Sequence, residues 1–140
     1  MNISVTTLAT DNLPYANASI QNKKEYCEKH GYDLKCYTES FDDRPHPWGK
    51  IKAVENVLES SWSDLEMLSP DWVLWVDADA FIMNDEIKLD SIIDNEYDLI
   101  ISTDCFTVNS GVFFVKNTEN SKTFLKKVYE KDHYIEHPWW

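Results

Sequence analysis

Glycine is scarce in this sequence, and its scarcity excludes two common ways of binding a nucleotide. Only three glycines occur among the 140 residues, Gly31, Gly49 and Gly111, and they lie far apart. A Rossmann fingerprint or a P-loop needs clustered glycines, because backbone N–H groups must approach the phosphates closely. If a nucleotide binds here, its phosphates must be neutralised in another way, and a metal ion is the expected means.

Cysteine, positive charge and long apolar runs are also scarce. The three cysteines match neither a disulfide framework nor a zinc pattern, which fits a reducing compartment. The 13 Lys and Arg residues are outnumbered by 25 Asp and Glu residues, and the net charge of −12 argues against binding a nucleic acid backbone. No apolar run approaches the roughly 20 residues of a membrane span, and no signal peptide is visible. We therefore expect a cytoplasmic or otherwise soluble protein.

Short apolar segments predict one α/β domain that covers residues 1–140. Strands are expected at residues 2–8, 32–38, 72–76, 98–102 and 111–115. Helices are expected from Pro14 to His30, after Trp48, at 88–93 and at 118–131, with a further helical turn around Leu65. The last helix is expected to turn Phe124, Leu125 and Val128 inward. The alternation of strands and helices predicts a layered fold with a largely parallel sheet.

Two aspartates directly follow the most apolar run of the chain. Residues 72–76 do not alternate, so we expect a central strand that is covered on both faces, and Asp77 and Asp79 come next. Ligands of open α/β sheets gather beyond the carboxyl ends of the strands, and carboxylates suit Mg²⁺ or Mn²⁺. One Asp-x-Asp is expected by chance in so acidic a chain. The position between two apolar runs nevertheless favours a binding site over a solvated loop.

With these aspartates the sequence becomes recognisable. Residues 72–84 (WVLWVDADAFIMN) resemble the DxD segment of GT-A fold glycosyltransferases. They most resemble the family of yeast α-1,6-mannosyltransferase subunits, α-galactosyltransferases and plant xyloglucan xylosyltransferases. Further segments agree with that family in order and spacing, at residues 25–34, 48–51, 109–114 and 137–140. The resemblance implies a GT-A-like, Rossmann-related fold with a central, mostly parallel sheet.

The resemblance also implies an activity and a set of site residues. The activity is transfer of a sugar from a UDP- or GDP-sugar to a glycan or other hydroxyl acceptor, with Mn²⁺ or Mg²⁺. Asp79 would bind the metal, and Asp77 would contact the metal or the donor ribose. The other assignments place Thr7 and Asp11 near the base, Lys50 near the diphosphate, and Asp104, Asn109 and Gly111 near the sugar. Asp77, Asp79 and Asp104 would be the catalytic residues.

Simpler interpretations stay open for several of these residues. Lys50 could equally be a solvated helix lysine, and residues 109–111 could form an ordinary turn before a strand. Members of the family continue well past residue 140, where a histidine completes the metal shell. The chain therefore looks shortened at its C-terminus, and a second subunit is one way to complete its site.

Two other functions also stay open. An apolar strand that ends in Asp-x-Asp opens the haloacid-dehalogenase phosphatases as well, where Asp77 would be the nucleophile and Asp79 the acid/base. The other alternative is a non-catalytic or truncated domain that binds a nucleotide sugar without transferring it. Nucleotide binding that needs a metal but leads to no transfer would identify this second case.

Overall fold

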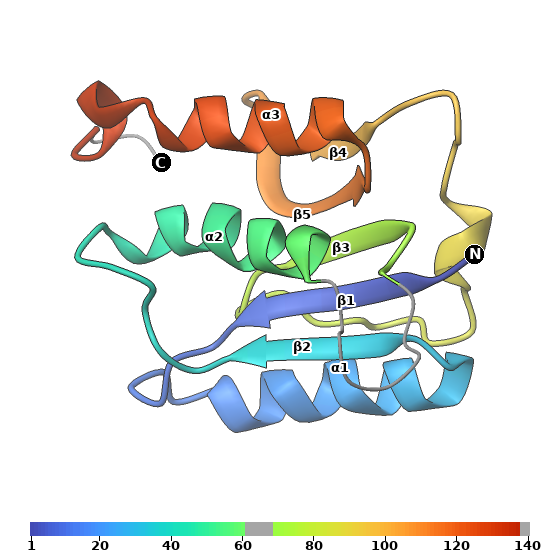
Figure 1. The fold of residues 1–140 in the computed structure, drawn as a ribbon. Coiled ribbons are helices and arrows are strands. Elements are labelled where there is room, and N and C mark those ends of the chain that lie inside the picture. Colours follow the sequence, from blue (N-terminus) through green and yellow to red (C-terminus); the bar gives the residue numbers. More distant parts are fainter. Residues whose placement is uncertain (61–68, 138–140) are drawn as a thin grey trace.

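A five-stranded sheet forms the centre of the molecule in the computed structural model, which describes residues 1–60 and 69–137 (Figure 1). The strand order is β2-β1-β3-β5-β4. Strands β1 (Ile3–Leu8), β2 (Asp33–Tyr37) and β3 (Trp72–Val76) are parallel. Strand β5 (Val108–Lys116) is antiparallel to β3, and β4 (Leu99–Thr103) is antiparallel to β5. All strands except β5 therefore point the same way, as the predicted GT-A-like fold requires.

Helices cover both faces of the sheet. Helix α1 (Ala16–His30) packs on one face, while α2 (His46–Glu59) and α3 (Glu119–Tyr129) pack on the other (Figure 1). Two short 3₁₀ helices complete the fold, η1 (Leu89–Ser91) and η2 (Asp132–Tyr134). Across residues 1–60 and 69–137, none of the helices combines the length and the apolar character that a bilayer crossing requires.

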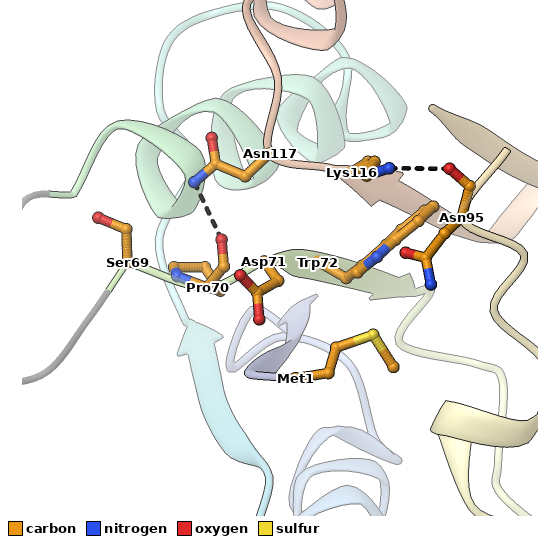
Figure 2. Close-up of a pocket in the computed structure, with 8 residues that line it drawn as sticks. All are labelled: Met1, Ser69, Pro70, Asp71, Trp72, Asn95, Lys116 and Asn117. Atoms are coloured by element: carbon orange, nitrogen blue, oxygen red, sulfur yellow. Dashed lines mark hydrogen bonds between the residues drawn. The ribbon is translucent and has the colours of Figure 1, made fainter. Parts of the chain in front are cut away.

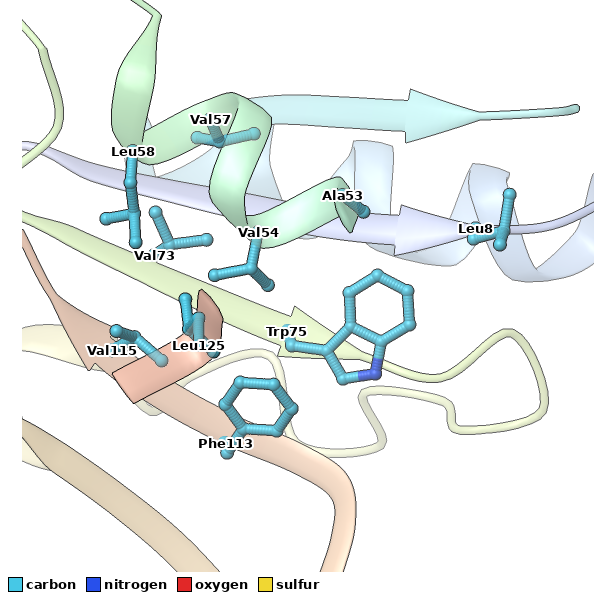
Figure 3. Packing of buried hydrophobic residues seen from close by; sticks show 10 residues of the cluster. All are labelled: Leu8, Ala53, Val54, Val57, Leu58, Val73, Trp75, Phe113, Val115 and Leu125. Atoms are coloured by element: carbon cyan, nitrogen blue, oxygen red, sulfur yellow. The ribbon is translucent and has the colours of Figure 1, made fainter. Parts of the chain in front are cut away.

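The central strand β3 is buried on both faces, which explains its unbroken apolar sequence. Trp72, Leu74 and Val76 pack in the apolar cluster on the α1 side. Val73 and Trp75 pack in the cluster on the other side, and Figure 3 shows them among side chains of α2, α3 and β5. The residues that follow β3 therefore start from a rigid position at the edge of the core.

The helix ends follow local rules that the sequence makes visible. Helix α1 ends at Gly31, whose φ of 76° is left-handed and suits glycine, and whose N–H bonds to the carbonyl of Cys27 at 2.8 Å. Pro47 lies in the first turn of α2, where its missing N–H costs nothing. Thr118 caps α3, because its side chain accepts a hydrogen bond from the N–H of Ser121.

The five strands and the three long helices confirm the sequence prediction, but several local predictions are wrong, and α2 begins at His46 and not after Trp48. A helix was expected at 88–93, but the structure has only the single turn η1 there. The hydroxyl of Tyr32 accepts a hydrogen bond from the N–H of Leu89 and donates one to Oδ2 of Asp90, and these bonds hold the segment in a non-helical conformation. Strand β5 begins at Val108, three residues earlier than expected, because Val108 pairs with Thr103 in a β4–β5 hairpin. Residues 109–111 are thus part of a strand.

The inward face of the last helix was also predicted incorrectly in part. Leu125 is buried as expected and Val128 is half-buried, whereas Phe124 is 50% exposed. Phe124 instead borders a groove beside the sheet, which is described below. The helical turn expected around Leu65 lies outside the described residues.

Candidate functional site

Asp77, the first residue after β3, is held by contacts from three elements. Its N–H donates to the carbonyl of Gly111 in β5 at 2.8 Å. Its Oδ1 accepts a hydrogen bond of 2.7 Å from Nε1 of Trp75 and lies 3.0 Å from the Nζ of Lys50 in α2. Because the side chain of Lys50 is only 11% exposed and that of Asp77 is 32% exposed, this ion pair is partly shielded from water. Its geometry is therefore more firmly fixed than that of a surface pair.

Gly111 leaves the space that this arrangement needs. A Cβ atom at Gly111 would lie 3.2 Å from Oδ2 of Asp77 and 3.0 Å from Oδ1 of Asn109. Both distances are tighter than ordinary van der Waals contacts, so a side chain here would push against two polar groups at once. Lys50 also contacts this part of β5, because its Nζ donates a hydrogen bond to the carbonyl of Ser110 at 3.1 Å. The start of β5 and the end of β3 therefore form one compact polar unit.

The turn between β4 and β5 is organised by Asp104. Its carboxylate accepts hydrogen bonds from the N–H groups of Phe106 and Thr107 at 2.8 and 3.1 Å, and from Nδ2 of Asn109 at 3.0 Å. These bonds lower the pKa of Asp104 below its usual value, because they favour the ionised form. Asn109 in turn accepts from the N–H of Gly111 at 2.8 Å. A continuous chain of hydrogen bonds thus links Asp104 to the surroundings of Asp77.

A groove of about 1050 Å³ opens beside this polar unit. Its walls are mostly apolar and come from α2, α3, β4 and β5, with Trp48, Ile51, Leu99, Ile101, Phe113, Phe124, Leu125 and Val128 among them. Its polar groups gather where β3 ends, and they include Lys50, Asp77, Asp104 and Asn109. An apolar groove with a few converging polar groups is typical of a small-molecule site.

The structure therefore brings five of the predicted site residues together: Lys50, Asp77, Asp104, Asn109 and Gly111. Thr7 is fully buried in β1 opposite Cys36, and its hydroxyl has no hydrogen-bond partner among residues 1–60 and 69–137. Asp11 is exposed in the loop after β1. Neither Thr7 nor Asp11 lines the groove, and neither does Asp79.

Asp79 differs from Asp77 in its surroundings. It is exposed, and within the described part of the chain its carboxylate forms no hydrogen bond or ion pair. The same residues offer no cluster of three or more His, Cys, Asp or Glu side chains around a metal position. Mg²⁺ in proteins is often bound by only one or two carboxylates together with substrate phosphates and waters. The residues present therefore fit a metal that binds with a diphosphate, and they do not form an all-protein metal cage.

Several contributors to the site were not predicted from the sequence. Trp75 lies two residues before Asp77, and this spacing puts both on one face of an extended chain, so its role was open to prediction. Ser110 acts through its backbone carbonyl, which no sequence pattern marks. Lys23 in α1 was overlooked although it occupies the buried face of the helix, four residues from Ser19 and from Cys27. A lysine at such a position is a signal that pattern analysis can find.

A second hollow, of about 430 Å³, lies at the opposite end of the sheet (Figure 2). Its polar groups satisfy one another: Lys116 donates to the carbonyl of Asn95 at 2.9 Å, and Asn117 donates to that of Pro70 at 3.0 Å. Among its described lining residues, the carboxylate of Asp71 accepts from the N–H of Asn2. These contacts hold chain segments together, so this hollow is a poorer candidate than the groove beside Asp77.

Comparisons with known proteins identify the family of this chain. A sequence profile of the galactosyl transferase GMA12/MNN10 family matches residues 2–97. An uncharacterized α-1,2-galactosyltransferase from Schizosaccharomyces pombe is 30% identical over 89% of this chain and 42% of its own length. The chain thus spans less than half the length of this curated relative.

Solved structures share the fold. A glycosyltransferase involved in glycosylation of the major capsid of PBCV-1 superposes with a TM-score of 0.75 at 21% identity, over 99% of this chain and 70% of that one. A mutant of Drosophila β-1,4-galactosyltransferase 7, in complex with manganese, UDP-Gal and xylobiose, gives a TM-score of 0.56 at 8% identity, over 84% of this chain and 50% of that one. These two likenesses support the GT-A-like fold.

Proposed function

Because this chain belongs to the galactosyl transferase GMA12/MNN10 family, we propose that it transfers a sugar from a nucleotide diphosphate to a hydroxyl acceptor. The observation that carries the proposal is the polar unit of Asp77, Lys50, Asn109 and Gly111 at the carboxyl end of β3, next to a groove large enough for a sugar nucleotide. Family membership argues against the phosphatase alternative, which we do not retain.

Lys50 is suited to bind the diphosphate of the donor. A lysine ammonium has three N–H donors, and here two of them are directed to Asp77 and to the carbonyl of Ser110. Its other contacts, with Oδ2 of Asp77 at 3.3 Å and with Oγ of Ser110 at 3.5 Å, are longer, so the third donor is available to a diphosphate oxygen. Asp77 fixes the ammonium in this position, and Trp75 fixes Asp77.

A divalent cation would reduce the electrostatic cost of binding an anionic donor to a chain with a net charge of −12. We assign Asp79 to hold it, because its carboxylate is exposed and uncommitted within the described residues and follows the groove-lining Asp77 by two residues. When bound, Mn²⁺ or Mg²⁺ would act as a Lewis acid on the departing nucleotide diphosphate. The manganese and UDP-Gal complex of a structural neighbour is consistent with this pairing of metal and donor.

Asp104 and Asn109 would orient sugar hydroxyls at the mouth of the groove. The lowered pKa of Asp104 makes its carboxylate a hydrogen-bond acceptor and a weak proton acceptor, so we assign it an orienting role. The side-chain amide of Asn109 is held in one orientation, because its Nδ2 donates to Asp104 and its Oδ1 accepts from the N–H of Gly111. The apolar walls would pack against the flatter faces of the donor or acceptor.

Calorimetry and a transfer assay together test the proposal. UDP, GDP and their sugars are titrated with and without Mn²⁺, and sugar release or transfer to simple glycan acceptors is then measured. We expect binding of one nucleotide class that requires Mn²⁺, followed by turnover. Metal-dependent binding without turnover would support the non-catalytic alternative. If no nucleotide binds under either condition, both the transferase proposal and that alternative are contradicted.

A further inference from the structure

Lys23 is a fully buried cation directly behind the segment that carries the acidic pair. It lies on the inner face of α1 with a relative exposure of 0%. Its Nζ donates to Oγ of Ser19 at 2.6 Å and to the backbone carbonyl of Ala80 at 2.8 Å. Ala80 directly follows Asp79, so the lysine binds the Ala80–Phe81 peptide group, one residue after the proposed metal ligand.

The neighbouring residue of α1 holds the same segment two positions further on. Nδ2 of Asn22 donates to the carbonyl of Ile82 at 2.9 Å, and the N–H of Ile82 donates back to Oδ1 of Asn22 at 2.8 Å. Between these anchors the ring of Phe81 lies 5.7 Å from the ammonium of Lys23. We name residues 77–82 the acidic loop. Two consecutive side chains of α1 therefore fix the second half of this loop.

Stability alone does not explain a lysine at this position. Burying an ammonium is costly unless a carboxylate neutralises it directly, and a packed apolar side chain is often the more stable choice. Within the described residues Lys23 has no carboxylate at ion-pair distance, although Asp77 and Asp79 both act on it electrostatically. Burial lowers the pKa of Lys23 to about 8. The charged lysine is therefore retained at a cost in stability. It lies on the α1 side of the sheet, whereas Lys50, which lines the groove, lies on the α2 side.

We propose that Lys23 is a positioning residue for the acidic loop, one that fixes the Ala80–Phe81 peptide, directly after Asp79, and offsets the negative charge of Asp77 and Asp79 before a cation binds. This inference rests on the proposed function, because it assigns Lys23 to the presentation of a metal-binding carboxylate. Removal of Lys23 leaves the loop free to turn Asp79 away, so a metal must reorder the loop on binding. The loss should therefore appear in metal affinity and much less in turnover at saturating metal.

The test compares Lys23→Met with Lys24→Met, a change of the adjacent, exposed lysine whose ion pair with Glu28 is long at 3.8 Å. Mn²⁺ affinity is measured by electron paramagnetic resonance in the presence of UDP or GDP, together with kcat and the Mn²⁺ concentration for half-maximal rate. Groups that orient metal ligands typically change metal affinity by about 10–100-fold. We expect Lys23→Met to weaken Mn²⁺ binding about tenfold or more, with kcat at saturating Mn²⁺ within about threefold, and Lys24→Met to change neither.

Asn22→Ala provides a second variant that keeps the buried charge and removes two anchors of the acidic loop. We expect it to weaken Mn²⁺ binding in the same direction, and we expect amide hydrogen exchange of residues 77–82 to quicken in both variants without metal. If the variants lower the melting temperature but leave Mn²⁺ affinity and this exchange unchanged, the positioning role is overturned. If the unmodified protein itself binds neither Mn²⁺ nor nucleotide, it is the proposed function that has failed.

Discussion

Lys50 and Asp77 form the polar contact on which the proposed donor site most depends. Their charged atoms lie 3.0 Å apart, and each has a second partner, the carbonyl of Ser110 for Lys50 and the indole of Trp75 for Asp77. Such shared contacts keep a long lysine side chain in one conformation, which lowers the entropy lost when it binds a phosphate. The sequence suggests both residues as site residues, but the contact between Lys50 and Asp77 depends on the order of the strands in the sheet.

Replacing Lys50 by methionine should weaken donor binding while the fold is kept. A hydrogen bond to a charged group contributes about 1.5–3 kcal/mol, which corresponds to roughly 10–100-fold in affinity. We therefore expect the dissociation constant of the nucleotide, measured with Mn²⁺ by calorimetry, to rise by that factor. Lys122→Met is the control, because Lys122 pairs with the exposed Glu119 on α3, away from the groove. An unchanged nucleotide affinity for Lys50→Met would remove Lys50 from the donor site.

Replacing Gly111 by alanine should damage the site more than the fold. The added Cβ would approach Asp77 Oδ2 to 3.2 Å and Asn109 Oδ1 to 3.0 Å, so one of these groups must shift. We expect kcat/KM to fall at least about tenfold, because small misplacements of site residues have large effects on rate. Gly31→Ala is the matched control. It strains the left-handed end of α1 and costs about 1 kcal/mol of stability, but should leave kcat/KM unchanged. Equal loss of activity in both variants would contradict the account.

At the scale of elements, the sequence predicted structure best where a segment had one clear local signal. The unbroken apolar run of β3 and the glycine that ends α1 predicted those elements closely. Strand β5 was predicted too short because Asn109 and Ser110 near its start are polar and lie in a hairpin with β4, where pairing and not burial decides the structure. Phe124 was misplaced because helical spacing cannot show that α3 borders an open groove.

The packing of α1 predicts a dependence of stability on pH. Burial raises the pKa of the Cys27 thiol to about 12, from 9.0 in the unfolded chain. As pH rises, the unfolded state therefore loses this proton before the folded state does. The contribution of Cys27 to the free energy of unfolding is complete below pH 9 and falls by about 1.4 kcal/mol per pH unit as pH rises towards 12. Lys23 acts in the opposite sense, because its pKa is lowered to about 8 and stability rises as pH moves from there towards 10.5.

Comparison with Cys27→Ala isolates the thiol from the other titrating groups. We expect the difference in the free energy of unfolding between the original protein and the variant to shrink between pH 9 and 10, as measured by urea denaturation. Cys105→Ala serves as the control for the loss of a thiol, because Cys105 is exposed. A difference that stays constant over this range would mean that Cys27 is not shielded as the structure indicates.

At the scale of the whole molecule, sheet topology explains why distant segments form one site. Strand β5 inserts antiparallel between β3 and β4, so residues 109–111 lie beside the aspartate that follows β3. Helix α2 packs on β1 and β3 and brings Lys50 to that point. The sequence predicted an α/β layered fold and most of the residues that meet at this site. It contained no signal that β5 would insert antiparallel between β3 and β4.

The acidic whole-molecule charge predicts that a nucleotide alone will bind poorly. With the net charge of −12 unopposed, the anionic nucleotide should raise the melting temperature little, whereas Mn²⁺ and nucleotide together should raise it clearly. A ligand at 100 times its dissociation constant stabilises a protein by about 2.7 kcal/mol, or several degrees for a chain of this size. Thermal unfolding with UDP or GDP, Mn²⁺, or both provides the comparison. A full shift with nucleotide alone would contradict the role of the metal.

The most direct test of the account counts bound manganese with and without the carboxylate of residue 79. Electron paramagnetic resonance is recorded for the original protein, Asp79→Asn and Asp85→Asn, each with UDP or GDP present. Asp85 is an exposed aspartate outside the acidic loop that pairs with Lys29, so its variant is the control. We expect one tightly bound Mn²⁺ per chain in the original protein and in Asp85→Asn, and none in Asp79→Asn. Undiminished manganese binding by Asp79→Asn would show that its carboxylate does not hold the metal.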